Sequence, residues 1–469
     1  MNARRERMKL ILLGALIIIA VIQTGMLWLG GMSGHNFLKQ TIKYEPIMPT
    51  NIWFVETSNS NTGVPGALAY RLDDTTGNEK REYERLIGEL SKLMDRQNEE
   101  GNMQKTDGVD WVKLLSMPSV IYEYEFPIDL ASITGESQNQ LIKEKIDHVI
   151  IYSKNKFEKE ATLFLVNSEE DFMYELSAVG TFDDIEKIYK VLTADDLKRH
   201  IMAYQPSATI DKVRLGGNSF LPTSSKETLL NYEVLTSYNP IDLSREEGYE
   251  KLESMINGLF VSPLVKEMVH QDENVIYTED MKTLVVYRPE GVIEYLNLAP
   301  RKLQTGTSML KGYNVALEFI DRVQVMPKSI ADNLYLADVK QKGLDFTYSF
   351  NMMYEGYRLQ LSEEMKANLG MDALVQVVVR GTDVIEAHFS TLEVVPKEVG
   401  LKALNTHYLE PIDKMYTLFE KQGIEDFMID HLELVYLLEG IGEDIDMTWG
   451  AVYDHKWYYP LIMRQIPGF

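Results

Sequence analysis

The amino-acid sequence predicts an α+β protein with one N-terminal transmembrane helix, followed by a multi-domain ectodomain of antiparallel β-meanders packed on helices. Two observations support this fold class. Residues 10–29 form a run of twenty residues without a charged side chain. The remaining chain holds short segments in which apolar and polar residues alternate, joined by turn sequences and interleaved with segments of helical periodicity.

The uncharged run fits a membrane-spanning helix. At ~1.5 Å rise per residue, twenty residues of helix cover roughly 30 Å, the thickness of a hydrocarbon core. Residues 1–9 carry four basic side chains and one acidic one, so the positive-inside rule keeps this tail in the cytoplasm. The alternative is a cleaved signal peptide, but residues 30–33 match its small-residue cleavage site poorly. The sequence therefore favours a single-pass protein of the cell membrane with its bulk extracytoplasmic.

Composition excludes several classes of protein. The formal charge is −24, and because residues 1–9 carry +3, the rest carries −27. That balance excludes the basic footprint of a nucleic-acid binder and disfavours contact with anionic lipid. It favours solubility and names no partner. The absence of cysteine excludes disulfides, thiolate catalysis and cysteine-based metal sites. The ectodomain must therefore be held together by its core, for which 45% hydrophobic residues suffice.

The chain after the membrane helix divides into a linker and three predicted domains. Residues 30–49 form the linker and residues 50–200 an N-terminal α+β domain. Residues 201–307 form a central domain and residues 308–469 a C-terminal domain, each a helix plus a β-meander. The shared order of helix and meander suggests that these last two domains are related.

In the N-terminal domain, the periodicity predicts four strands and two helices. The expected strands are residues 52–55, 122–126, 148–152 and 161–166, and the expected helices lie within 79–94 and 185–192. In the strand at 122–126, Glu123 and Glu125 alternate with aromatic residues. That alternation predicts a strand that is buried on one face only.

The other two domains follow the same reasoning. Expected strands of the central domain are residues 232–236, 275–278, 283–287 and 292–296, with a helix at 245–257. The C-terminal domain has an expected helix within 313–323 and strands at 334–339, 346–350, 374–380, 384–389, 432–438 and 448–457. Gly381-Thr382-Asp383 is expected to be a three-residue hairpin connection.

No catalytic constellation stands out. Of the eight histidines, no two are spaced for a helical metal site. Two Ser-x-x-Lys sequences, ending at Lys156 and Lys311, match the nucleophile motif of penicillin-interacting enzymes, but the Lys-Thr-Gly strand is missing. Asp444 and Asp446 resemble the start of a calcium loop in which Trp449 replaces the required glycine. We therefore expect a protein that is not an enzyme, with no catalytic, cofactor-binding or metal-binding residues.

One face of the predicted membrane helix is suited to contact a partner helix. Ala20, Gln23, Thr24 and Leu27 follow the i, i+3, i+4, i+7 spacing. Small and amide side chains associate membrane helices through close packing and hydrogen bonds. In the alternative interpretation, Gln23 and Thr24 lie near the outer interface and meet water. Both interpretations remain open.

The order of these features resembles the YycH family, whose members have a short basic tail, one membrane helix and a large cysteine-free ectodomain. The most specific likeness runs over residues 259–297. It comprises LFVSPLV at 259–265, NVIYTED at 274–280, TLVVY at 283–287 and EYLN at 294–297. The family has glycine after the aspartate of that turn, and this chain has Met281, which leaves the turn type open. Residues 310–395 are also similar to YycH and its paralogue YycI.

The resemblance implies a regulatory function. Members of the family are extracytoplasmic regulators of the WalK/WalR (YycG/YycF) two-component system of low-GC Gram-positive bacteria. This implies that the chain binds a WalK-type sensor histidine kinase and a YycI-like paralogue, modulating cell-wall metabolism with a sign left open. A cytoplasmic tail of nine residues is too short to signal alone. A ligand-sensing ectodomain and an anchored envelope hydrolase remain the alternatives.

Overall fold

The structure is a computed structural model. It describes residues 44–58, 66–71, 83, 103–115, 119–135, 144–153, 161–178, 198–202, 213–216, 219–222, 229–300, 307–454 and 456–461. The predicted membrane helix at 10–29, its face of Ala20, Gln23, Thr24 and Leu27, and the expected helix at 185–192 lie outside these residues. Of the expected helix at 79–94, only Tyr83 is described. No helix in the described ranges combines the length and apolar character needed to cross a membrane.

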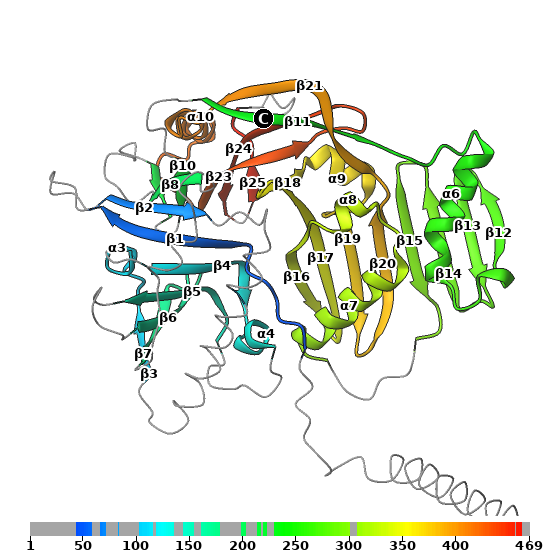
Figure 1. The fold of residues 1–469 in the computed structure, drawn as a ribbon, viewed down its shortest axis with the longest axis horizontal. Coiled ribbons are helices and arrows are strands. Elements are labelled where there is room, and N and C mark those ends of the chain that lie inside the picture. Colours follow the sequence, from blue (N-terminus) through cyan, green and yellow to red (C-terminus); the bar gives the residue numbers. More distant parts are fainter. Residues whose placement is uncertain are drawn as a thin grey trace, which may run out of the picture. The chain divides into compact units, whose positions relative to one another are not determined.

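Residues Tyr44–Phe469 form one compact unit that contains two large sheets. The first sheet has nine strands in the order β10-β8-β2-β1-β4-β5-β6-β7-β3, and all its pairs are antiparallel. Its strands are β1 (Asn51–Ser58), β2 (Gly66–Arg71), β3 (Met103–Asp107), β4 (Ser119–Ile128), β5 (Ile146–Ser153), β6 (Ala161–Asn167), β7 (Phe172–Ala178), β8 (Lys198–Met202) and β10 (Phe220–Pro222). Short helices α3 (Trp111–Leu114) and α4 (Leu130–Thr134) accompany it (Figure 1).

The second sheet has fourteen strands in the order β12-β13-β14-β15-β20-β19-β17-β18-β23-β24-β11-β21, with β16 on β17 and β25 on β24. Its strands are β11 (Leu229–Tyr238), β12 (Glu267–Gln271), β13 (Asn274–Glu279), β14 (Thr283–Arg288), β15 (Val292–Asn297), β16 (Leu334–Lys342), β17 (Asp345–Tyr354), β18 (Tyr357–Leu361), β19 (Val375–Arg380), β20 (Asp383–Ser390), β21 (Glu393–Asn405), β23 (His431–Leu438), β24 (Asp444–Tyr453) and β25 (Lys456–Tyr458). The pair β18–β23 is parallel. Two further strands, β9 (Val213–Leu215) and β22 (Phe427–Ile429), pair in parallel with each other.

Helices pack against the second sheet. They are α6 (Glu246–Ile256), α7 (Met309–Val323), α8 (Lys328–Ala331), α9 (Glu363–Leu369) and α10 (Leu409–Glu420). Ser308 begins α7 as its N-cap, accepting a 3.3 Å hydrogen bond from the backbone N–H of Lys311, so this Ser-x-x-Lys sequence starts a helix. Gly312 allows close packing, because a Cβ there would lie 2.2 Å from the hydroxyl oxygen of Tyr348. That hydroxyl donates to the Met309 carbonyl at 2.7 Å.

The expected α+β class with mostly antiparallel strands is confirmed by the described residues. The boundaries expected at residues 200 and 307 stay predictions, and β15 pairs with β20 across the second of them. The prediction of a three-residue connection at Gly381-Thr382-Asp383 is wrong. Asp383 pairs with Arg380, which leaves a two-residue turn, and a β-bulge at Val378/Val379 absorbs the extra residue.

The prediction that one face of β4 is exposed is also wrong. Glu123 is only 5% exposed, since the strand is covered on both faces. Its carboxylate accepts hydrogen bonds from Asn51 Nδ2 at 3.1 Å and Trp53 Nε1 at 2.6 Å. These donors come from β1, the neighbouring strand. A buried carboxylate needs such donors, and local alternation contains no information about them.

Candidate interaction surface

Exposed apolar side chains gather where the segment before β12 meets the turn between β13 and β14. Leu264 is 100% exposed, Val261 91% and Met281 88%. We call this surface the apolar end, and it consists of Val261, Leu264, Val265, Met268, Val269, Met281 and Leu298. Exposed apolar side chains that gather in one region mark an interaction site more often than isolated exposed residues do.

The backbone beneath the apolar end is held in place by a buried carboxylate. Glu279 is 5% exposed and accepts hydrogen bonds from the backbone N–H of Val261 at 3.0 Å and of Ser262 at 2.5 Å. The short helices η2 (Asn257–Leu259) and η3 (Pro263–Val265) flank this segment. The Lys266 ammonium donates to Asn257 Oδ1 at 2.6 Å and lies 5.8 Å from the centre of the Tyr277 ring. The exposed side chains therefore project from a fixed backbone.

Backbone hydrogen bonds join the other members of the apolar end to the same place. The N–H of Lys282 donates to the carbonyl of Glu279 at 2.8 Å, and the N–H of Leu298 donates to the carbonyl of Lys282 at 2.7 Å. Because Glu279 also holds Val261, the three segments that carry Val261, Met281 and Leu298 meet at one end of the meander.

The turn that carries Met281 has an unfavourable backbone conformation. Asp280 has φ 48° and Met281 has φ 54°, and the hydrogen bond from Lys282 to Glu279 closes the turn. Positive φ at both central residues is the pattern of a type I′ turn, which favours asparagine and glycine. A methionine in this conformation costs about 1–2 kcal/mol. Met281 thus combines an unfavourable backbone conformation with an exposed apolar side chain.

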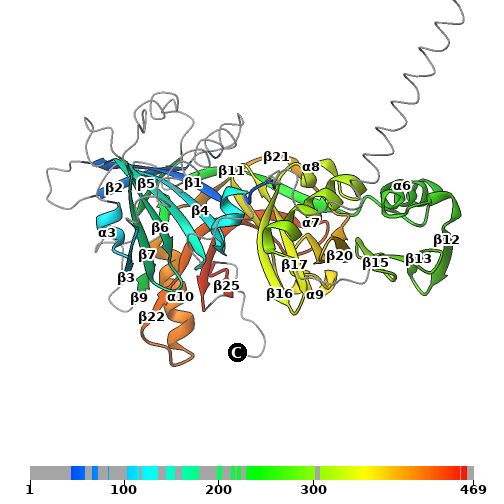
Figure 2. The same cartoon turned by 90° about the horizontal axis from the view of Figure 1, so that it is seen from below.

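Strand β12 forms an open edge of the second sheet beside the apolar end. All five of its residues are exposed, and among the described strands it pairs with β13 alone. It lies at the outer edge of the sheet in both views (Figure 1 and Figure 2). The turn to β13 has two residues, so Gln271 and Asn274 form a hydrogen-bonded pair. By alternation, the N–H and C=O groups of Met268 and His270 point away from β13, toward solvent.

The surroundings of this edge are acidic. Residues 245–273 contain seven carboxylate side chains and three basic ones, an excess of four negative charges. Four of these carboxylates belong to α6, which packs beside β12, and the Tyr249 ring lies 5.8 Å from the His270 ring. Lys266 lies 3.8 Å from Glu253 and offsets part of this charge. The potential at the open edge is therefore negative.

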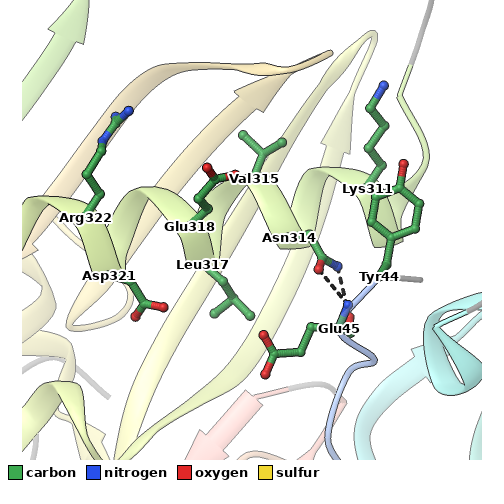
Figure 3. A pocket seen from close by; sticks show the side chains of 9 residues that line it. All are labelled: Tyr44, Glu45, Lys311, Asn314, Val315, Leu317, Glu318, Asp321 and Arg322. Carbon is green, nitrogen blue, oxygen red and sulfur yellow. Dashed lines mark hydrogen bonds between the residues drawn. The ribbon is translucent and has the colours of Figure 1, made fainter. Parts of the chain in front are cut away.

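A second feature lies where the chain enters the compact unit. A hollow of about 600 Å³ on α7 is lined by Tyr44, Glu45, Lys311, Asn314, Val315, Leu317, Glu318, Asp321 and Arg322. Figure 3 shows these side chains spread along the helix rather than converging on one point. The Asn314 amide accepts a 2.7 Å hydrogen bond from the N–H of Glu45 and donates one of 2.9 Å to its carbonyl. Asn314 thus clamps the entering chain to α7.

A buried charged cluster joins the two sheets. Arg358 of β18 is 4% exposed and donates to Glu433 of β23 and, at 2.6 Å, to Glu125 of β4. Burial raises the pKa of Glu125, although Arg358 opposes this. Burial also opposes ionisation of Glu433, but Arg358 and His431 hold its pKa at about 2. For His431, burial is outweighed by Glu433, 3.5 Å away, and the histidine pKa is raised.

The suspected calcium residues have other partners. Asp444 and Asp446 lie in strand β24 rather than in a loop. Asp444 pairs with Lys397, and Asp446 accepts from Lys402 at 2.8 Å and from the Tyr232 hydroxyl at 3.0 Å. Across the described ranges, no group of three His, Asp or Glu side chains is placed to hold a metal ion.

Sequence reasoning missed the apolar end as a surface. It identified residues 259–297 only as the stretch that most resembles the family. Two signals could have identified the surface. The apolar run at 259–265 has neither the alternation of a strand nor the spacing of a helix, and Met281 is an apolar residue within a turn sequence. The buried charged cluster was missed because its members are far apart in sequence.

Comparison with solved structures shows a likeness over most of the chain. The crystal structure of YycH from Bacillus subtilis superimposes with a TM-score of 0.51 at 11% identity, covering 91% of this chain and 99% of that chain. The chain has a YycH-like fold. An uncharacterized protein from Eubacterium rectale matches with a TM-score of 0.34 at 11% identity, over 52% of this chain and 82% of its own. No family model matches the sequence, and no curated protein matches it significantly.

Proposed function

We propose that this chain is a membrane-anchored extracytoplasmic regulatory protein with a binding role rather than a catalytic one. It binds a WalK-type sensor histidine kinase and a YycI-like paralogue, and so modulates two-component control of cell-wall metabolism. The observation that carries the proposal is the YycH-like fold, which extends over 99% of the YycH chain. The apolar end supports it, because a regulator without catalytic output needs a surface for a partner.

The clamp at the chain entrance offers a mechanical link for such a regulator. Besides the Asn314 contacts, the N–H of Tyr44 donates to the Gly135 carbonyl at 3.1 Å, and the N–H of Ile47 donates to the Ser132 carbonyl at 2.8 Å. The Tyr83 hydroxyl donates to the carbonyl of Ile47 at 2.6 Å. A pull on the chain at Tyr44 would act on α7 and α4 through these contacts.

The predicted membrane helix supplies a second contact in this proposal. Lipid gives no hydrophobic drive for helix association, so close packing and side-chain hydrogen bonds must provide it. Ala20, Gln23, Thr24 and Leu27 share a helical face and would contact the kinase helix. The apolar end and this face then act together, one outside the membrane and one within it.

The test is co-purification of the full-length chain from membranes with a WalK-type kinase and a YycI-like paralogue. The double variant Ala20→Ile with Gln23→Leu should weaken kinase association by about 1–3 kcal/mol, roughly ten- to a hundredfold. Ile18→Leu with Ile22→Leu, on the opposite face, is the matched control and should change nothing. If a generic poly-leucine span supports the same kinase binding, the helix serves only as a tether. Failure of both proteins to co-purify would overturn the proposed function.

A further inference from the structure

The open edge of β12, the apolar end and the acidic surroundings together describe a site for an extended chain. We propose that β12 is a strand-addition site. Its occupant is a segment of a protein partner that is apolar at alternate positions and flanked by lysine or arginine. The segment pairs with the free edge at Met268 and His270 and covers the apolar end. The inference rests on the proposed function only for which protein supplies the strand.

The backbone of β12 is suited to strand addition. Proteins protect exposed sheet edges with lysine, proline, bulges or a covering element. β12 has the sequence EMVHQ, without lysine or proline, and its pairing with β13 has no register shift. Among the described strands only β13 pairs with β12, so the outward N–H and C=O groups at Met268 and His270 are open to a further strand there. Main-chain hydrogen bonds of this kind give strand addition its affinity.

The side chains around the edge determine what kind of strand fits. Met268 stands opposite Tyr277 on one face of the sheet, and Val269 stands opposite Ile276 on the other. An added strand would therefore meet apolar contacts on both faces. Leu264 and Val261 extend this apolar surface beyond the start of β12. Glu279 fixes the backbone at Val261 and Ser262, and the N–H of Val265 donates to the Ser262 carbonyl at 3.0 Å. Because this segment is already held, less ordering entropy is lost on binding.

Charge selects a basic partner over a second copy of this chain. The excess of four negative charges in residues 245–273 attracts a strand with basic flanks. Two copies paired through β12 would bring two such acidic regions together, on chains that each carry −24. This repulsion opposes self-association, whereas a basic segment gains from the same field.

The first arm of the test uses synthetic strand peptides as probes. Two labelled peptides share a core of alternating valine and threonine, one flanked by lysines and the other by glutamates. Binding to the full-length chain in detergent is measured by fluorescence anisotropy. The lysine-flanked peptide should bind roughly tenfold or more tightly than the glutamate-flanked one, and the difference should shrink as salt is raised.

The second arm separates backbone pairing from side-chain contact. His270→Pro removes an outward N–H, while His270→Ala removes the same side chain and keeps that N–H. The proline variant should lose roughly tenfold or more in affinity, and the alanine variant should stay within about twofold of wild type. Leu264→Ser should also weaken binding, whereas Leu344→Ser, at another exposed leucine, should not. Thermal unfolding of each variant checks that the fold is intact.

Several results would overturn the inference. These are equal affinities of the proline and alanine variants, equal affinities of the two peptides, or no measurable binding of the lysine-flanked peptide. A dimer detected by sedimentation and abolished by His270→Pro, without peptide binding, would assign the edge to a second copy. Peptide binding without kinase co-purification would leave this inference standing while the proposed function fails. If the kinase co-purifies equally well with the His270→Pro variant and no peptide binds, the proposed function stands and this inference fails.

Discussion

Replacing Met281 by glycine should stabilise the fold while weakening partner binding. Methionine at φ 54° carries about 1–2 kcal/mol of backbone strain, which glycine does not share. Glycine adds chain entropy to the unfolded state, which costs about 0.4–1 kcal/mol. The Met281 side chain is 88% exposed, so its removal sacrifices little burial. The expected net gain in unfolding free energy is the difference of these two terms, about 0–1.6 kcal/mol with a midpoint of about 0.8 kcal/mol.

The assay is urea denaturation of the full-length chain in detergent, followed by circular dichroism. Met48→Gly is the matched control, because Met48 is also exposed, at 39%, but is absent from the residues with positive φ. That variant should lose about 0.4–1 kcal/mol, since glycine there relieves no strain. Binding of the lysine-flanked peptide should weaken for Met281→Gly and stay unchanged for Met48→Gly.

Two outcomes would refute this reasoning. If both glycine variants lose the same stability, Met281 is not strained and the turn argument fails. If Met281→Gly is stabilised but binds the peptide as wild type does, the strain exists without serving the surface. Met281→Asn offers an independent check, because asparagine tolerates positive φ without adding as much unfolded-state entropy as glycine.

Three further predictions concern the clamp and the buried cluster. Arg358→Met should cost about 3–5 kcal/mol of unfolding free energy in denaturant, because two buried carboxylates lose their cation. Asn314→Ala should cost about 1–2 kcal/mol and expose the segment at Glu45 to proteolysis, since the two hydrogen bonds between the Asn314 side chain and the Glu45 backbone are lost. Stability should fall as pH rises from about 6.5, because the raised pKa of His431, and that of His148 beside Asp147, stabilises the fold only while the histidine is protonated. His431→Gln should flatten that fall; an unchanged slope would locate it elsewhere.

The parts of the fold that the sequence predicts are those encoded by local periodicity. The apolar stripe of α7 and the alternation in β13, β14 and β15 depend on side chains within a few residues of one another. The pairing of distant strands is a different problem. Nothing local shows that β15 pairs with β20 or that β18 runs parallel to β23, because many strands of similar composition compete for those places.

The misjudged residues share one physical cause. Glu123 and Glu125 have the local pattern of an exposed strand face, yet their partners are distant in the chain. Trp53 lies 70 residues from Glu123, and Arg358 lies 233 residues from Glu125. Burial of a carboxylate is possible only when such donors arrive, and the alternation rule assumes that none do. For the apolar end the error has the opposite sign: a hydrophobic run is ordinarily assigned to the core, but these side chains are exposed.

The negative charge around β12 accounts for how its open edge can be tolerated. An unprotected edge strand beside exposed leucine, valine and methionine side chains would ordinarily promote aggregation. In this chain the protection does not come from lysine or proline on the strand but from the field around it. The excess negative charge of residues 245–273 repels a second copy over a distance of about 8 Å at physiological salt. The same field attracts a basic strand. One distribution of charge therefore disfavours pairing with a second copy and favours pairing with a basic partner.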